Sequence, residues 1–153
     1  MVLNKWSVLL VSVLLMCLSI VFPVNAQNLT ENSRLEQLGT IIIESADNLA
    51  QLGGKVVALD NDIAVDNENK KAGKPLSIPL NKLKKDFSKL KRDVEVLNKN
   101  IKFSVEELKA LKAIIPENNY IEFNSLLNEI VSENELLNNH LTRIEGLLKN
   151  LEK

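Results

Sequence analysis

The stretch YIEFNSLLNEIVSENELLNNHLTRIEGLLKNL, residues 120–151, decides the fold. Its apolar residues recur at alternating steps of three and four, the spacing of a helix face that packs on other helices. A helix of this length spans roughly 45 Å, and an apolar face so long requires partner helices to cover it. The members of the face are Tyr120, Phe123, Leu127, Ile130, Leu137, Leu141, Ile144, Leu148 and Leu151, and Asn134 stands at the one polar position in the series.

Two earlier segments repeat this spacing. The first follows the capping box formed by Ser33 and Glu36 and has one polar residue, Ser45, on its apolar face. Extra apolar residues widen that face, as expected for a helix that touches two neighbours. The second runs from Leu80 to Ile115, again with a single polar residue, Ser104. The apolar positions of the first face are Leu35, Leu38, Ile42, Leu49, Leu52, Val56, Leu59 and Ile63.

The second segment contains two competing signals. Ser104 and Glu107 form another capping box, with Phe103 and Leu108 placed as a hydrophobic staple, which favours a new helix start at Ser104. The three-four spacing nevertheless continues across this point, and it favours one helix with at most a mild kink.

These segments predict an all-α fold, an antiparallel three-helix up-down-up bundle with coiled-coil-like heptad packing. We expect helices over residues 33–63, 79–115 and 117–152 within a bundle that covers residues 33–152. The spacing fails over residues 64–78, which contain Gly73 and Pro75, and predicts a mobile linker there. Residues 27–32 are expected to form an exposed tail.

The first 26 residues are typical of a secretory signal peptide, with Lys5, an apolar run and small residues before a cleavage site at Ala26. The prediction is therefore a secreted chain that begins at Gln27; an uncleaved membrane anchor over residues 6–24 is the alternative. The only cysteine, Cys17, lies inside this leader, so the mature chain is free of disulfides and thiolate sites. Asn28 begins an Asn-x-Thr triplet and is the expected glycosylation site if the source is eukaryotic.

The register of the three faces brings their polar residues together. If Leu35 lies level with Ile115 and Tyr120, Ser45 and Ser104 share one layer and Asn134 lies in the next. We expect a small hydrogen-bonded polar spot that fixes the register of the bundle. A hydrated pocket or a ligand contact is the functional alternative.

Charge is distributed unevenly along the chain. Residues 70–102 hold eleven basic and three acidic residues, a net of +8, whereas the segments before and after are acidic. Four cations, Lys82, Lys85, Lys89 and Arg92, are the candidate contact with an anionic surface. Asp86 and Asp93 interrupt the run and no aromatic residue is expected on its outer face, so a solvated or internally paired face is the simpler interpretation.

No catalytic, cofactor or metal site is expected. His140 is the only histidine and is predicted at the surface, flanking the apolar face. Three acids, Asp60, Asp62 and Asp66, have partial calcium-loop spacing, but Val65 and Lys71 occupy the positions that require glycine and glutamate.

The sequence therefore predicts a secreted, non-enzymatic bundle that acts through protein–protein interaction or self-association. A lipid or hydrophobic-ligand carrier that uses amphipathic helices is one alternative. An anionic-polymer binder that uses the basic middle helix is another, with nucleic acid not favoured as the polymer.

Overall fold

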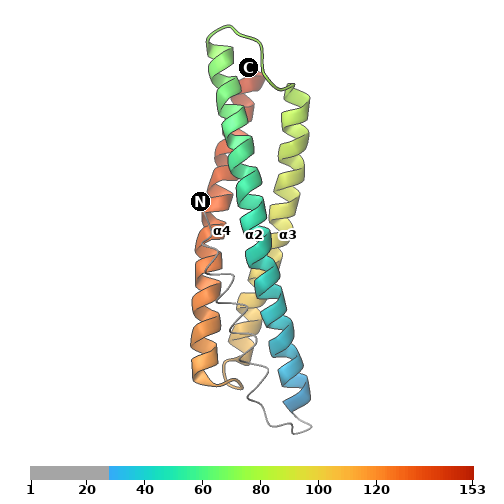
Figure 1. Cartoon of the computed structure of the whole chain (residues 1–153), viewed down its shortest axis with the longest axis vertical. Helices are drawn as coiled ribbons and strands as arrows, with labels where there is room; N and C mark the ends of the chain where they lie inside the picture. Colours follow the sequence, from blue (N-terminus) through green and yellow to red (C-terminus); the bar gives the residue numbers. More distant parts are fainter. Residues whose placement is uncertain (1–27) are drawn as a thin grey trace.

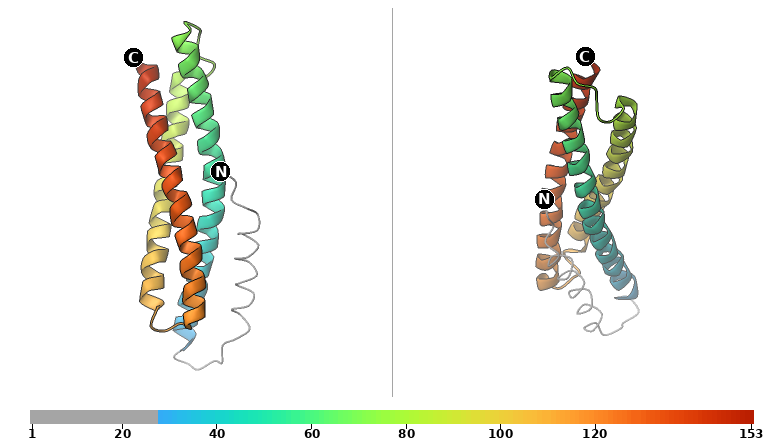
Figure 2. Two further views of the ribbon diagram at one scale, coloured as in Figure 1. Left: turned by 90° about the vertical axis from the view of Figure 1, so that its left-hand side faces the viewer. Right: turned by 45° about the horizontal axis from the view of Figure 1, so that its top comes forward.

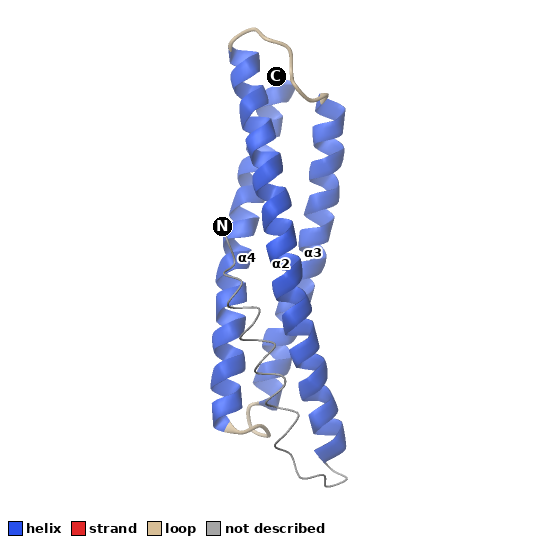
Figure 3. Ribbon diagram, viewed as in Figure 1, coloured by secondary structure: helices blue, strands red, loops and turns tan. Residues whose placement is uncertain are grey.

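The computed structural model describes residues 28–153, with side chains from Ser33 onward. Three helices make up the fold: α2 Asn28–Lys71, α3 Leu80–Leu111 and α4 Glu117–Glu152 (Figure 1). No strand occurs over residues 28–153 (Figure 3), so the prediction of an all-α, three-helix fold is confirmed. The expected signal peptide, residues 1–26, and the alternative anchor over residues 6–24 lie outside the described residues.

The helices lie side by side along most of their length, and each contacts the other two (Figure 2). α2 and α4 run in the same direction, and α3, which connects them in sequence, runs in the opposite direction (Figure 1). None of these three helices combines the length and the continuous apolar character needed to cross a membrane.

The core is built from the positions that the three-four spacing marks. The aliphatic residues of the first face, from Leu35 to Ile63, are all buried, and so are Ser45 and Ser104. In α4, eight of the nine apolar positions are buried and Tyr120 is half-buried. Since each helix turns a continuous apolar face inward, no disulfide or metal is needed to form this core.

The first helix is longer than expected at both ends. α2 begins at Asn28, so residues 28–32 form its first turns rather than an exposed tail. Ser33 and Glu36, which predicted a helix start, lie inside the helix, because neither glycine nor proline occurs over residues 28–38 to end it. The Gly53-Gly54 pair lies within this continuous helix.

At its other end α2 continues to Lys71, eight residues beyond the expected end at Ile63. Two polar side chains explain the difference, because both are buried and find partners in other parts of the chain. Asn67 Nδ2 donates to the Leu147 carbonyl of α4, at 3.2 Å. Asp66 accepts hydrogen bonds from the backbone N–H groups of Ser77 and Ile78, at 2.6 and 3.1 Å.

The linker is consequently shorter than expected, over residues 72–79, and it is tied to α2. Gly73 has φ +68°, and the hydrogen bonds Gly73 N–H to Lys70 O and Lys74 N–H to Asn69 O form a Schellman motif. Asp66 then holds the chain that leads into α3, where Pro79 precedes the first helical residue.

α3 is one helix from Leu80 to Leu111, without a restart at Ser104. It ends four residues before the expected end at Ile115. Ile114 and Ile115 both donate to the Leu111 carbonyl, which tightens the chain into a turn, and Pro116 disfavours a helical conformation at the residue before it.

Candidate functional site

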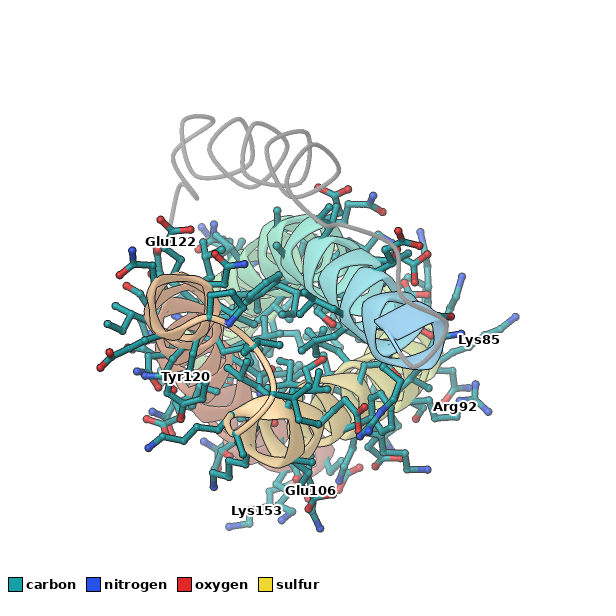
Figure 4. All side chains as sticks on the ribbon, turned by 90° about the horizontal axis from the view of Figure 1, so that it is seen from below. Lys85, Arg92, Glu106, Tyr120, Glu122 and Lys153 are labelled. Atoms are coloured by element: carbon teal, nitrogen blue, oxygen red, sulfur yellow. The ribbon has the colours of Figure 1, made fainter. Side chains whose placement is uncertain are left out.

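The outer face of α3 carries a line of cations at the three-four spacing. Lys82, Lys85, Lys89 and Arg92 are all exposed, and they share one side of the helix because steps of three and four return to the same face. Seen along the bundle, Lys85 and Arg92 project outward on the same side, away from the centre (Figure 4). The sequence-predicted contact residues are thus brought together.

Neighbouring cations on α3 have a different role. Lys84 Nζ pairs with Glu152 of α4 at 2.6 Å, and Lys91 Nζ lies 3.8 Å from Glu145. These two lysines face α4, where they offset the acidic charge of that helix. Within residues 33–153, by contrast, the four outer cations form no ion pair with an acid. The internal ion pairs expected for the basic helix are therefore formed by Lys84 and Lys91, on the side toward α4. They do not involve the four outer cations.

The acids that interrupt the basic run lie toward α2. Asp86 and Asp93 line a shallow groove of about 320 Å³ between α2 and α3, together with Lys55, Asp62 and Lys89. The two aspartates therefore flank the outer line of cations on the side toward α2, where Lys89 lines the same groove.

Three further residues extend the same line: Val96, Lys99 and Phe103. All three are exposed, Val96 to 57% and Phe103 to 49%. Lys99 forms no ion pair in the part of the chain that the structure describes. We call the seven residues the α3 stripe: Lys82, Lys85, Lys89, Arg92, Val96, Lys99 and Phe103.

Phe103 adds an aromatic residue to this face beyond the basic run; within the run, over residues 82–92, the only aromatic residue is Phe87, which is buried. The staple of Phe103 with Leu108 was inferred from a helix start at Ser104, and no helix starts there. The spacing of the cations continues from Arg92 in steps of four, three and four residues to Val96, Lys99 and Phe103. This continued spacing is the sequence signal that identifies them. The next residue at this spacing is Glu106, whose carboxylate lies 3.9 Å from Lys102 Nζ. It projects on a different side of the bundle from Lys85 and Arg92 (Figure 4).

Ser45, Ser104 and Asn134, expected to form one hydrogen-bonded polar spot, have different hydrogen bonds in the structure. Leu52 and Leu97 line one groove between α2 and α3, and Ser45 and Ser104 lie one heptad further along each antiparallel helix, at the same level. Both serines are fully buried, and neither hydroxyl has a hydrogen-bond partner among the described residues.

Asn134 instead bonds to a residue that the sequence reasoning missed. Its Nδ2 donates to Asn98 Oδ1 at 2.6 Å, and Asn98 Nδ2 donates to Asn138 Oδ1 at 3.2 Å. Asn98 and Asn138 are half-buried beside the apolar faces. Asn134 and Asn138 are neighbours four residues apart on α4, and the register of α3 against α4 brings Asn98 to them. The spacing of apolar residues within one helix gives no signal for this contact.

A second polar cluster joins α2 to α4. Asp60 is buried, with His140 Nδ1 3.5 Å from its Oδ2 and Arg143 Nε 3.4 Å from its Oδ1. Asp60, Asp62 and Asp66 lie on a continuous helix and cannot converge as a calcium loop does. Over the described residues, no three histidine or acidic side chains are grouped closely enough to hold a metal ion.

Asn28, the expected glycosylation site, is the first residue of α2, and its side chain is outside the described part. No protein-family model, curated protein sequence or solved structure matches this chain. Its function is therefore argued from its own residues, and the α3 stripe is the candidate functional site.

Proposed function

We propose that this chain is a secreted, non-enzymatic helical-bundle protein that binds an anionic partner through the α3 stripe. The observation that carries the proposal is the line of exposed cations, none of which is paired with an acid within residues 33–153. Lys82 and Lys99 are separated by roughly 25 Å along the helix, a length over which several negative groups are contacted at once.

The charge of the stripe favours an anionic partner over a neutral one. Each lysine or arginine held near an anionic surface contributes about 1 kcal/mol, and the contribution falls with added salt. Lys82, Lys85, Lys89 and Arg92 together therefore supply about 4 kcal/mol, which corresponds to about a thousandfold in affinity. Glu95, exposed beside the stripe, reduces this attraction.

Retention of the full chain on immobilised heparin tests the proposal. The variant K82Q/K85Q/K89Q/R92Q removes four positive charges from the stripe, and K74Q/K109Q/K149Q/K153Q removes four elsewhere, so net charge is matched. We expect the first variant to elute at much lower salt than the second. Equal elution of the two variants contradicts a localised site, and failure of the unmodified chain to bind at low salt rejects the proposal.

Self-association is the second candidate, and exposed apolar residues at one end of the bundle favour it. Ile114 in the turn after α3 and Ile121 in the first turns of α4 are 43% and 56% exposed. The extra apolar residues of α2 offer less surface than expected, because Ile41, Ile43 and Val57 are partly covered.

The third candidate, a carrier that opens to take up lipid or another hydrophobic ligand, has weaker support. A loose helix at Gly53-Gly54 and a long mobile linker would favour such an opening. The glycine pair lies within continuous α2, and the shorter linker is held by Asp66.

A further inference from the structure

We infer that the anionic partner of the α3 stripe is the surface of a lipid bilayer, into which Val96 and Phe103 insert. This inference rests on the function proposed above and names its partner. The stripe combines two kinds of side chain on one helix face: five exposed cations and two apolar side chains that are about half exposed.

The apolar residues distinguish a bilayer from a soluble polyanion. A polymer such as heparin offers sulfates and carboxylates but no apolar phase, so Val96 and Phe103 gain little from it. At a bilayer the same side chains leave water for the acyl boundary, and burial of apolar area is favourable in proportion to that area. Basic residues combined with phenylalanine on one helix are typical of interfacial binding.

The cations of the stripe can contact the lipid phosphates while Val96 and Phe103 are inserted at the acyl boundary. Lys82, Lys85, Lys89 and Arg92 occupy the first half of the stripe, and Lys99 lies between the two apolar residues. Long lysine and arginine stems extend their charged ends toward lipid phosphates while the helix lies against the surface. Each cation close to an anionic bilayer raises affinity roughly fivefold.

The acidic residues near the stripe limit the orientations in which the bundle can contact an anionic bilayer. Asp86 and Asp93 lie in the groove toward α2, and exposed Glu106, one step of three beyond Phe103, projects on a different side of the bundle from Lys85 and Arg92 (Figure 4). Glu95 is exposed and adjoins the stripe. A pose with Lys85, Arg92 and Phe103 toward the bilayer keeps the charge that meets the lipid phosphates predominantly positive.

Binding of the full chain to vesicles tests the inference with a matched pair of variants. V96S/F103S removes the exposed apolar residues of the stripe, and I121S/L136S removes two others, which are 56% and 47% exposed on α4. We expect V96S/F103S to weaken binding to vesicles containing phosphatidylglycerol roughly tenfold, with heparin elution unchanged. The control variant is expected to leave both measurements unchanged, and the apolar run of residues 8–22 is common to all variants.

A fluorescence measurement reports insertion directly. Trp6 is the only tryptophan, so W6F/F103W places a single indole on the stripe. We expect its emission to shift to the blue with phosphatidylglycerol vesicles and to be quenched by brominated acyl chains, but not with phosphatidylcholine vesicles.

The possible failures are distinguishable. If the indole is not quenched and V96S/F103S binds vesicles normally, while heparin retention still depends on the four stripe cations, the bilayer inference is overturned and the proposed function stands. If V96S/F103S weakens heparin and vesicle binding equally, the apolar residues serve a polymer site and the inference is again overturned. If the unmodified chain binds neither heparin nor anionic vesicles, both proposals fail.

Discussion

Asn134 of α4 donates a 2.6 Å hydrogen bond from its Nδ2 to Oδ1 of Asn98 on the antiparallel helix α3. Asn138 joins the pair, since its Nδ2 lies 3.3 Å from the same oxygen and 2.7 Å from the Asn134 carbonyl. A polar residue in an otherwise apolar series favours one register, because slipping the helices leaves its amide without a partner.

A double-mutant cycle measures this relationship. We expect Asn98→Ala and Asn134→Ala each to lower the free energy of unfolding by about 1 kcal/mol, and the double variant to lower it by less than their sum. Urea unfolding of the four proteins gives the coupling energy. Asn139→Ala, at an exposed position of α4, is the control and is expected to raise the free energy of unfolding slightly, because alanine favours the helix. Additive effects of Asn98→Ala and Asn134→Ala contradict the bond.

Unlike the asparagines, the buried serines Ser45 and Ser104 are expected to stabilise the fold when they are replaced by alanine. Neither hydroxyl has a hydrogen-bond partner among the described residues, and an unpaired buried hydroxyl is destabilising. We expect Ser45→Ala and Ser104→Ala to raise the free energy of unfolding by about 0.5–1 kcal/mol, since alanine also favours the helix. Chemical denaturation measures the change, and exposed Ser88→Ala is the comparison. A loss of stability at both core positions shows that these hydroxyls are bonded.

Asp66 predicts an acid-sensitive contribution to stability. Burial disfavours its charged form, but hydrogen bonds from the Ser77 and Ile78 backbone, with further bonds from the Ser77 and Asn69 side chains, outweigh burial and lower the pKa of Asp66 below its ordinary 3.8. Since the folded state holds the carboxylate at a lower pKa than the unfolded state, this stabilisation is present above pH 3.8 and is lost as the pH falls through the folded-state pKa.

The variant Asp66→Asn tests this directly. We expect it to lower the free energy of unfolding at neutral pH by about 1–3 kcal/mol, because charge-assisted hydrogen bonds to two N–H groups are lost. Unfolding measured across acidic pH is expected to show the gap between the two proteins closing as the pH falls below 3.8. A gap that stays constant rules out the carboxylate as its source. Asp62→Asn, at an exposed position of the same helix, is the control.

The end of the bundle that carries the exposed residues Ile114 and Ile121 is where self-association is tested. We expect I114S/I121S to lower the average molar mass measured by light scattering at high protein concentration, if contact between copies buries these side chains. V96S/F103S changes the same number of exposed apolar residues on another face and is the matched control. A strictly monomeric unmodified chain excludes this candidate.

The sequence predicts the buried faces well, because the three-four spacing of apolar residues is itself the cause of their burial. Leu35 to Ile63 and Phe123 to Leu151 illustrate this: a face that removes so much apolar surface from water has one favourable orientation. The end of α2 could not be read in the same way. Asp66 and Asn67 suggest a polar linker locally, whereas their partners at Ser77, Ile78 and Leu147 exist only in the folded chain.

The candidate site, too, could be predicted only in part from the sequence. The four cations Lys82, Lys85, Lys89 and Arg92 were predictable from spacing, but whether each is paired depends on which acids of α4 come within reach. Lys84 and Lys91 meet Glu152 and Glu145, and the outer four do not. Phe103 was assigned to a helix start because local capping chemistry at Ser104 competes with the continuous pattern of α3.

The most direct test of the proposed function is amide chemical-shift mapping of the full chain titrated with a short heparin fragment. We predict that the largest shifts fall on residues 82–99 of α3 and that they disappear as salt is raised, because exposed charges are screened. Shifts concentrated on the outer faces of α2 or α4, or shifts on α3 that persist at high salt, contradict an anionic contact through the α3 stripe.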